Sequence, residues 1–156
     1  MHASVEWSVS AFDKLGRLEL HDVLRLRQDV FIVEQKCAFR EIDGRDPHAL
    51  HVLGRVDGRL VAYARVFAPD VATPEAIIGR VVTDRSVRGS GIGRALMREA
   101  LRIAGLIAPE AAVRVAAQAH LVSFYSSLGF EPAGDPYLED GILHLDMVRP
   151  RGTALA

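Results

Sequence analysis

The chain has 156 residues, which suits a single domain with a sizeable hydrophobic core. Hydrophobic residues make up 49% of it and charged residues 25%, as in ordinary soluble globular proteins. The formal net charge is -1, so the charge balance indicates neither nucleic acid nor a membrane surface as a partner. Arginine supplies most of the positive charge, since lysine occurs only at Lys14 and Lys36, and we interpret this as compositional bias.

Cys37 is the only cysteine in the chain. A disulfide within the chain is therefore impossible, a cysteine-rich zinc site is excluded, and we expect no metal. Residues 1–17 lack the continuous apolar stretch of a secretion signal, and no window approaches the ~20 apolar residues of a membrane-spanning helix. We therefore expect a cytoplasmic protein.

The first half of the chain predicts one helix among four strands. Residues 5–10 alternate in polarity and are expected to form a strand, and residues 19–33 have the helical spacing of an amphipathic helix. Residues 34–48 are polar and rich in turn formers, which indicates a loop. Two strands then flank Asp57-Gly58, a strong hairpin signal, and residues 76–83 form another strand.

The second half predicts two helices, one strand and a closing hairpin. A helix is expected from residue 91 to 104, a buried strand at 111–118, and a short helix at 120–130 that Gly129 ends. Residues 131–148 are expected to form a hairpin that turns near Asp140-Gly141.

This order of elements indicates one mixed α/β or α+β domain over residues 1–150. The same order, with its two hairpins, predicts a sheet that is mixed but mostly antiparallel. Residues 151–156 are expected to be a frayed tail.

Three glycines occupy alternate positions, Gly89, Gly91 and Gly93, where strand 76–83 gives way to the next helix. Each costs backbone entropy, and close packing would explain one such glycine more readily than three. A P-loop needs Gly-Lys-Ser/Thr, but Arg94 follows the last glycine here. A dinucleotide fingerprint needs a small third residue, where this chain has Arg94 or Leu96.

A third explanation for the glycines is a pyrophosphate-binding loop of another kind, which we call the cradle. Residues 88–93 read R-x-x-G-x-G at the start of a helix. Helix N-termini have unpaired N–H groups and partial positive charge, so they bind phosphate, and missing β-carbons let phosphate oxygens approach. Arg88 would add a charge-assisted contact.

This motif resembles the coenzyme A pyrophosphate motif of the GNAT superfamily, whose members use acyl-CoA to acylate amines. Residues 123–130, "SFYSSLGF", resemble the superfamily's last helix, where a tyrosine precedes a Gly-Phe pair. Four further segments together resemble the ElaA branch: 27–37, 41–51, 117–120 and 139–144. The resemblance extends from about Leu20 to Met147, and it implies the GNAT fold, with helices on both faces of the central sheet.

The chain departs from the superfamily pattern at three positions. Arg85 stands where a proline often precedes the arginine-glycine pair, and Leu143 stands where the ElaA branch has proline. Gln118 stands where many members have asparagine; it keeps the amide but lengthens its reach.

The resemblance implies which residues bind the coenzyme. The loop 88–94 would hold the pyrophosphate, while strand residues 81–83 pair their backbone with the pantetheine arm and direct one N–H at the thioester carbonyl. Tyr125 would be the general acid that protonates the departing thiolate, although it could equally be a core aromatic with its hydroxyl tied to backbone. The expected coenzyme contacts are Val81, Val82, Thr83, Arg88, Gly89, Ser90, Gly91, Ile92, Gly93, Arg94, Gln118 and Tyr125.

The general base and the acceptor site are less constrained. Glu34 is a second candidate catalytic residue, since it ends the first helix beside the loop that borders the acceptor site in this superfamily. Asp43, Asp46 and Glu139-Asp140 are interpreted first as turn residues, and Cys37 as a bystander. The candidates for acceptor binding are Glu34, Gln35, His51, His120, Glu139 and His144.

The sequence thus predicts an acetyl-CoA-dependent N-acetyltransferase that acts by direct transfer to a primary amine. The acceptor would be a small molecule or a peptide, and the resemblance is compatible with a homodimer. Two alternatives stay open: a non-catalytic acyl-CoA binding or sensor domain, and a nucleotide-binding module that uses the glycine loop.

Overall fold

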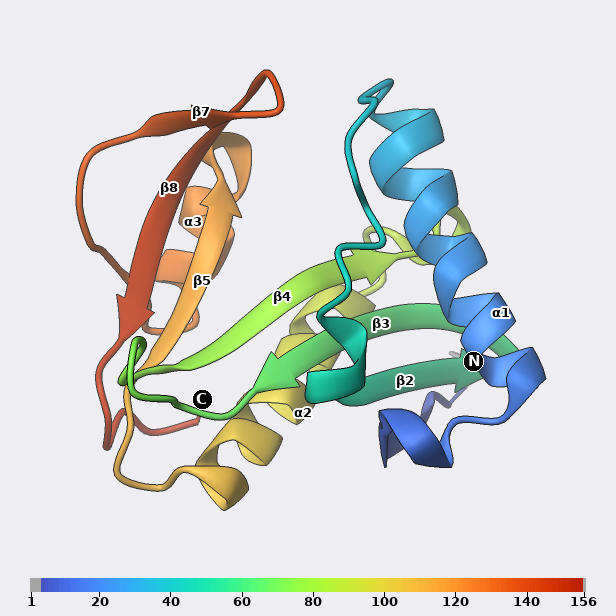
Figure 1. Cartoon of the computed structure of the whole chain (residues 1–156), viewed down its shortest axis with the longest axis horizontal. Coiled ribbons are helices and arrows are strands. Elements are labelled where there is room, and N and C mark those ends of the chain that lie inside the picture. Colours follow the sequence, from blue (N-terminus) through green and yellow to red (C-terminus); the bar gives the residue numbers. More distant parts are fainter. Residues whose placement is uncertain (1–3, 156) are drawn as a thin grey trace.

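An eight-stranded mixed sheet runs through the computed structural model, which describes residues 4–155 (Figure 1). Its strand order is β1-β2-β3-β4-β5-β8-β6, and β7 also pairs with β8. All pairs are antiparallel except β4 with β5, which confirms the predicted fold class. The strands are β1 (Glu6–Ala11), β2 (Leu50–Val56), β3 (Arg59–Phe67), β4 (Ala76–Thr83), β5 (Val113–Gln118), β6 (Glu131–Pro132), β7 (Tyr137–Glu139) and β8 (Ile142–Arg149).

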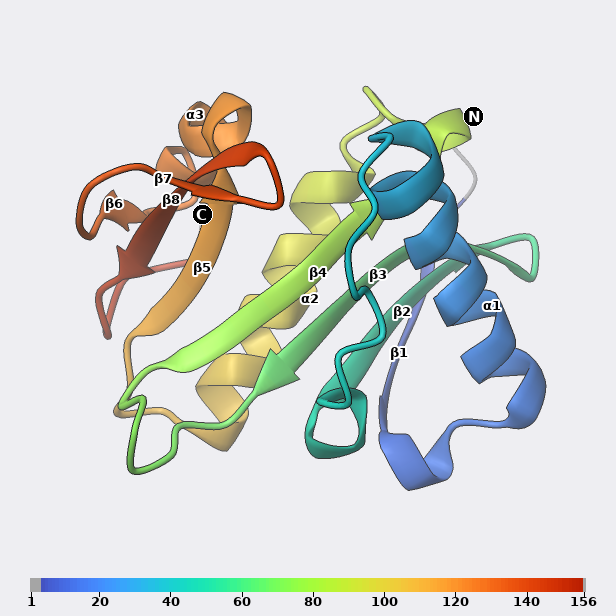
Figure 2. The ribbon, with the colours of Figure 1, turned by 45° about the horizontal axis from the view of Figure 1, so that its top comes forward.

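Helices cover both faces of the sheet (Figure 2). On one face lies α1 (Arg17–Arg27), which continues through π-helical turns over Gln28–Glu34 and buries an apolar stripe against β2 and β3. On the other face α2 (Ile92–Ile107) and α3 (Val122–Ser126) share the larger core with β2, β3, β4 and β5. The apolar positions of α2 recur at helical spacing, and this spacing directs them onto the sheet: Leu96, Met97, Ala100, Leu101, Ile103 and Ala104.

Two tight turns connect strands as the sequence predicts. Asp57 and Gly58, between β2 and β3, have φ values of 50° and 77°, and Asp140 and Gly141, between β7 and β8, have the same values. Positive φ at both central residues is the geometry of a type I′ turn, which matches the twist of the strands that it joins.

The strands β4 and β5 form a fork. Only Ala76 with Val113 and Ile77 with Arg114 are paired, after which the two strands diverge (Figure 1). Toward Thr83, the edge of β4 that faces β5 has no strand partner among the described residues. A bulge with Arg80 at φ 51° interrupts the pairing of β4 with β3 and adds to the bend of this strand.

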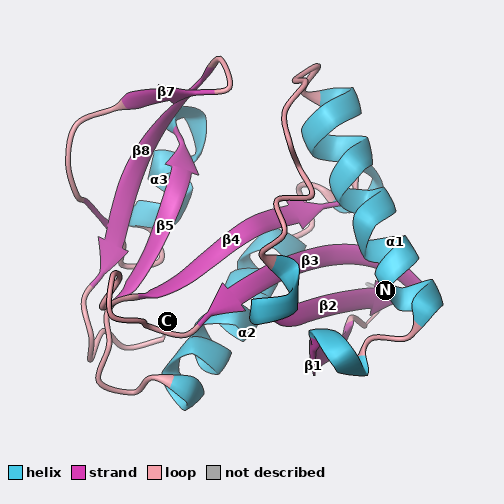
Figure 3. Cartoon of the chain, viewed as in Figure 1, coloured by secondary structure: helices cyan, strands magenta, loops and turns pink. Residues whose placement is uncertain are grey.

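The loop after the π-helical turns, residues 35–49, crosses the face of β4 and β3 (Figure 3). At the other end of the chain, residues 151–155 lie back on the domain. Arg149 Nη2 donates a hydrogen bond to the Ala154 carbonyl at 2.8 Å, although a frayed tail was expected from the sequence. Among residues 4–155, the helices lack the combination of length and apolar composition that crossing a bilayer requires.

Candidate active site

The fork between β4 and β5 opens into a cleft of about 760 Å³. Its walls are the two strands, the π-helical turns, the loop that follows them and the β7–β8 turn. Most of the expected site residues line this cleft: Glu34, Gln35, Val81, Val82, Thr83, Arg88, Gly93, Gln118, His120, Tyr125, Glu139 and His144. Segments distant in sequence are thus brought together where the sheet separates.

The glycine loop forms the N-terminus of α2 at one end of the cleft. Gly89 and Gly91 have φ values of 78° and 86°, so their backbone conformation itself requires glycine. The N–H of Ala95 is the first in the helix to reach back, to the Gly91 carbonyl at 3.1 Å. The N–H groups that precede it in the first turn have no intrahelical partner.

Gly93 needs a different explanation, because its φ is not in the left-handed region. A β-carbon added there would meet only Thr83 Cγ2, at 3.9 Å, an ordinary contact. Glycine inside a helix costs about 1 kcal/mol relative to alanine, and neither backbone nor packing requires it at this position. Gly93 lines the cleft, so the space it leaves lies in front of unpaired N–H groups. The loop therefore fits the pyrophosphate that the motif predicts.

Arg88 and Glu34 form an ion pair at this end of the cleft. Arg88 Nη1 lies 2.7 Å from Glu34 Oε2, and Nη2 donates to the Thr83 carbonyl at 3.1 Å. The carboxylate expected to serve as base or acceptor contact is therefore bonded to the arginine expected to hold phosphate. Arg94 differs from the expectation, since its guanidinium donates to Ser127 Oγ at 2.7 Å and does not line the cleft.

Tyr125 lies on α3 with 5% of its surface exposed. Its ring is held edge-on between Phe124 and Phe130, with centroids 5.2 and 5.7 Å away. Burial raises the pKa of Tyr125 to about 12. No hydrogen bond joins its hydroxyl to any residue in the range 4–155, so the hydroxyl is not tied to backbone. The ring packs in the core, while the side chain lines the cleft with a proton that it can donate.

Two polar links cross the open end of the fork. The amides of Gln35 and Gln118 exchange hydrogen bonds, with Nε2–Oε1 distances of 3.5 and 3.3 Å. Cys37 Sγ donates to the Asp140 carbonyl at 3.1 Å, and this contact and its burial agree with a structural cysteine. Gln118, expected to contact the coenzyme, is thus bonded to Gln35, the first residue after the π-helical turns.

His144 is the histidine in the cleft whose protonation pattern the structure defines. Its Nδ1 lies 2.8 Å from the Ile142 carbonyl, which can only accept, so Nδ1 carries the proton. In the neutral ring Nε2 then has a free lone pair, 4.0 Å from Glu139 Oε2. The ring stacks on Tyr137 at 5.9 Å, which fixes its orientation.

His51 does not reach the cleft, which corrects its expected role in acceptor binding. The ring is fully buried in β2, where Nε2 donates to the Asp46 carbonyl at 2.9 Å and Nδ1 accepts from Tyr63 Oη at 2.7 Å. Burial lowers the pKa of His51 below its ordinary value. This histidine is therefore a neutral structural residue.

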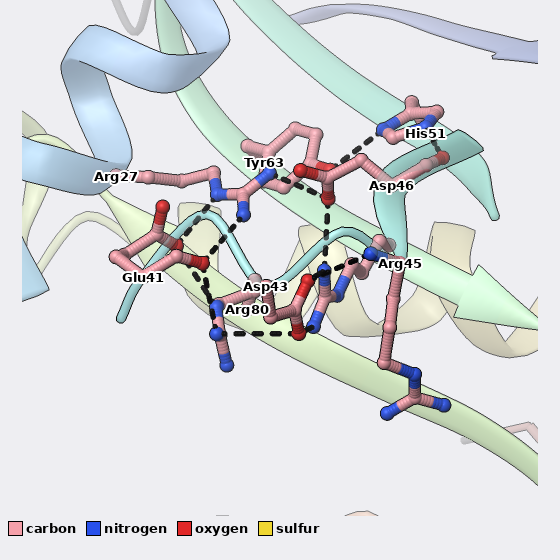
Figure 4. A network of polar contacts seen from close by, with 9 residues as sticks. Arg27, Glu41, Asp43, Arg45, Asp46, His51, Tyr63 and Arg80 are labelled. Carbon is pink, nitrogen blue, oxygen red and sulfur yellow. Dashed lines mark hydrogen bonds and ion pairs between the residues drawn. The ribbon is translucent and has the colours of Figure 1, made fainter. Parts of the chain in front are cut away.

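A network of six charged side chains underlies the cleft and was not predicted (Figure 4). We call it the charge network; it consists of Arg27, Glu41, Asp43, Asp46, Arg65 and Arg80. Arg27, with no exposed surface, lies 2.8 Å from both Glu41 Oε1 and Asp46 Oδ1. Arg65 Nη1 also lies 2.8 Å from Asp46 Oδ1, and Arg80 Nε lies 2.8 Å from Glu41 Oε1.

The charge network fixes the loop 35–49 on the sheet. Asp43 has the expected turn role, since Oδ1 accepts from the Arg45 N–H at 3.0 Å, but it also pairs with Arg65. From the composition alone we interpreted the excess of arginine over lysine as bias, but Arg27, Arg65 and Arg80 each have a defined acidic partner. One signal was available in the sequence: Arg65 interrupts the apolar run "AYARVF", and a buried charge needs a partner.

Comparison with known proteins places this geometry in a family. A family model described as "Acetyltransferase (GNAT) domain" matches residues 22–150. ElaA of Escherichia coli is 40% identical over 147 residues, which cover 93% of this chain and 96% of ElaA. The crystal structure of that ElaA superimposes with a TM-score of 0.87, over 94% of this chain and 99% of the other.

Two acyltransferase structures have the same architecture. An acyl-CoA N-acyltransferase from Pseudomonas aeruginosa has a TM-score of 0.89 at 39% identity, over 94% of this chain and 99% of its own. An aminoglycoside 6'-N-acetyltransferase, solved in complex with coenzyme A, has a TM-score of 0.72 at 12% identity, over 96% of this chain and 99% of its own. At that identity the second likeness shows the fold alone. The chain therefore belongs to the GNAT acetyltransferase family of N-acyltransferases, in the branch that includes ElaA.

Proposed function

We propose that the protein transfers an acetyl group from acetyl-CoA directly to a primary amine that enters the cleft of the fork. One observation carries the proposal: a single cleft combines the N-terminus of α2, the unpaired edge of β4 and the protonated hydroxyl of Tyr125. These three elements supply a phosphate site, a hydrogen-bonding edge for an extended amide chain and a proton donor.

The donor half of the cleft would bind acetyl-CoA through backbone groups. The first-turn N–H groups of α2 and the guanidinium of Arg88 hold the pyrophosphate in front of Gly93. The pantetheine arm lies along the free edge of β4 at residues 81–83, where N–H and C=O groups have no strand partner on that side. The coenzyme itself supplies the acetyl thioester.

Proton transfers complete the reaction. The neutral amine attacks the thioester carbonyl, a new C–N bond forms and the C–S bond breaks. Tyr125 gives its proton to the departing thiolate, because burial keeps it protonated at neutral pH. We propose that His144 Nε2 accepts the proton that the amine loses, since Nδ1 already donates to Ile142, Nε2 has a free lone pair in the neutral ring and the side chain lines the cleft.

Gly93→Ala tests the donor site with little risk to the fold. The new methyl group makes only an ordinary contact with Thr83 and improves helix propensity, so the free protein should be at least as stable. The methyl group would occupy the phosphate cradle, and we expect acetyl-CoA affinity to fall at least tenfold in calorimetry. Gly105→Ala is the matched control, because it also lies in α2 but has open space around it.

If Gly93→Ala binds acetyl-CoA as tightly as the wild type, the pyrophosphate does not bind in front of Gly93. A thiol-release assay with acetyl-CoA and a broad amine library tests the chemistry separately. Tight coenzyme binding without release on any amine would indicate the acyl-CoA sensor instead. In a melting experiment, acetyl-CoA at 100 times its Kd should stabilise the protein by about 2.7 kcal/mol.

A further inference from the structure

Arg45, in the loop 35–49, brings to the cleft a positive charge that has no partner among the described residues. Arg45 lines the cleft, and within residues 4–155 its guanidinium has no ion pair and no side-chain hydrogen bond. It lies 4.3 Å above the ring of Phe67, which holds it over the cleft floor, and Figure 4 shows it extending away from the charge network. Arg40, from the same loop, also lines the cleft without an ion pair among these residues.

Arg45 is exposed, whereas a second donor without a partner in residues 4–155, on β3, is buried. Arg65 is 3% exposed, and its two Nη atoms are bonded to Asp43 and Asp46. Its Nε is the buried side-chain nitrogen or oxygen that lacks any hydrogen-bond partner within the described part of the chain. A buried charged donor without a partner costs free energy, and a ligand atom bonded to it would offset this cost.

On the neighbouring strand, a glycine that lines the cleft lies beside this buried donor. Gly79, which pairs with Arg65 between β4 and β3, lines the cleft and has no side chain to fill the space. A β-carbon at Gly79 would lie 4.0 Å from Arg65 Nε. The guanidinium of Arg65 is 5.1 Å from the centre of the Phe67 ring, so both arginines lie against this ring.

We propose that Arg45, Arg65 Nε, Phe67 and Gly79 form a carboxylate subsite, and that the acyl acceptor is an amine that also carries a carboxylate. An arginine presents paired N–H donors that match a planar carboxylate, and Phe67 supplies an apolar floor. The other arm of the fork has the opposite character, with Glu139, Asp140 and His144 at the β7–β8 turn. A free amino acid, or another amino carboxylate, is complementary to both arms.

The same observations disfavour polycationic acceptors. An acceptor that carries several ammonium groups would place positive charge beside Arg45, which has no carboxylate of its own to screen it. This inference rests on the proposed acyl transfer, because only then is the subsite's ligand the acceptor. Its test must therefore separate binding of the carboxylate from catalysis.

The test uses reaction products as probes, so it does not depend on turnover. N-acetyl derivatives of glycine, leucine and phenylalanine, each as free acid and as primary amide, are titrated calorimetrically into the protein with coenzyme A present. We expect at least one acid to bind tenfold or more tightly than its amide. Arg45→Gln should bring that ratio close to one, whereas Arg17→Gln, an exposed arginine on α1 away from the cleft, should preserve it.

A second variant keeps the test independent of Arg45. Gly79→Ala places a methyl group at ordinary contact distance from Arg65 Nε, so the chain can tolerate it while the subsite is filled. It should reduce the preference for the acid. If a carboxylate-bearing amine is a substrate, Arg45→Gln should raise its KM at least tenfold and change kcat little.

The outcomes are distinguishable. Coenzyme binding without any preference for acid over amide, or a preference unchanged in Arg45→Gln, would overturn the carboxylate subsite while leaving the acyltransferase intact. A preference for the acid in a protein that binds no coenzyme A would overturn the proposed function and leave an anion site. Better turnover of a polyamine than of any amino carboxylate would also overturn the subsite.

Discussion

The absence of a hydrogen-bond partner for the Tyr125 hydroxyl among residues 4–155 supports its proposed role as proton donor. Its ring is packed between two phenylalanines, yet its hydroxyl bonds to no other described residue. The side chain lines the cleft, and the hydroxyl retains accessible surface. The position is best explained if the hydroxyl meets a ligand atom during the reaction.

Tyr125→Phe is expected to lower kcat by about 100-fold or more, because the thiolate loses its proton donor. The melting temperature should stay nearly the same, since the ring remains and the hydroxyl has no hydrogen bond within the described part of the protein to lose. In the wild type, the rate should show no alkaline decline caused by Tyr125 below about pH 11, because burial raises its pKa to about 12. Thiol release measured across pH checks both points, and unchanged turnover would restrict Tyr125 to the core.

At the scale of elements, the edge strand β1 depends on one glycine. Trp7 in β1 pairs with Gly54 in β2, and its ring lies over the position that a side chain there would occupy. A β-carbon at Gly54 would approach Trp7 Cζ3 to 2.6 Å, which real contacts do not allow. The indole therefore packs directly on the backbone of β2.

Gly54→Ala should destabilise the protein by about 1–3 kcal/mol, because Trp7 must move and the β1–β2 pairing must adjust. Gly105→Ala, in the exposed part of α2, should instead stabilise it by about 0.5–1 kcal/mol. Urea unfolding of the two variants measures both effects. A neutral Gly54→Ala would mean that β1 does not pack as the structure shows.

Local patterns were sufficient to predict most elements. The Asp-Gly turns, the helical spacing in α2 and the R-x-x-G-x-G motif are each written within a few consecutive residues. The π-helical turns, the bulge at Arg80 and the fork could not be predicted in this way, because they depend on how distant segments pack. Gln118 illustrates the limit, since its partner Gln35 is 83 residues away.

The charge network was not predicted, and the role of His51 was predicted wrongly, for a related reason. The ion pairs of the charge network join residues that are 14, 19 and 39 positions apart, so no short window of the sequence contains both partners. Strand β2 is covered on both faces, and its residues 51 to 54 are all buried. Alternation in the sequence therefore could not tell whether His51 faces the cleft or the interior.

At the scale of the whole molecule, acidification should destabilise the fold in two steps. Burial lowers the pKa of His51 below its ordinary 6.5, so the unfolded chain binds this proton more readily than the folded one. The group's contribution is complete above pH 6.5 and is lost as the pH falls below that value. A hydrogen bond from Arg65 holds the pKa of Asp43 well below 3.8, which adds a second loss below about pH 4.

Urea unfolding at pH 7, 6, 5, 4 and 3 measures the two steps. The free energy of unfolding should fall between pH 6.5 and 5, and fall again toward pH 4 and below. His51→Gln should remove the first decline and keep the second, because the charge network remains. A free energy that stays level from pH 7 to 5 would show that His51 can take up a proton inside the fold.

The amide pair of Gln35 and Gln118 has a consequence for how ligands enter. The strands β4 and β5 meet at Ala76 and Val113, and at the far end of β5 the amide pair joins Gln118 to the residue that follows the π-helical turns. The amide hydrogen bonds are long, at 3.3 and 3.5 Å, so this link between Gln35 and Gln118 is weak and is the contact that opens most easily when a ligand enters the cleft.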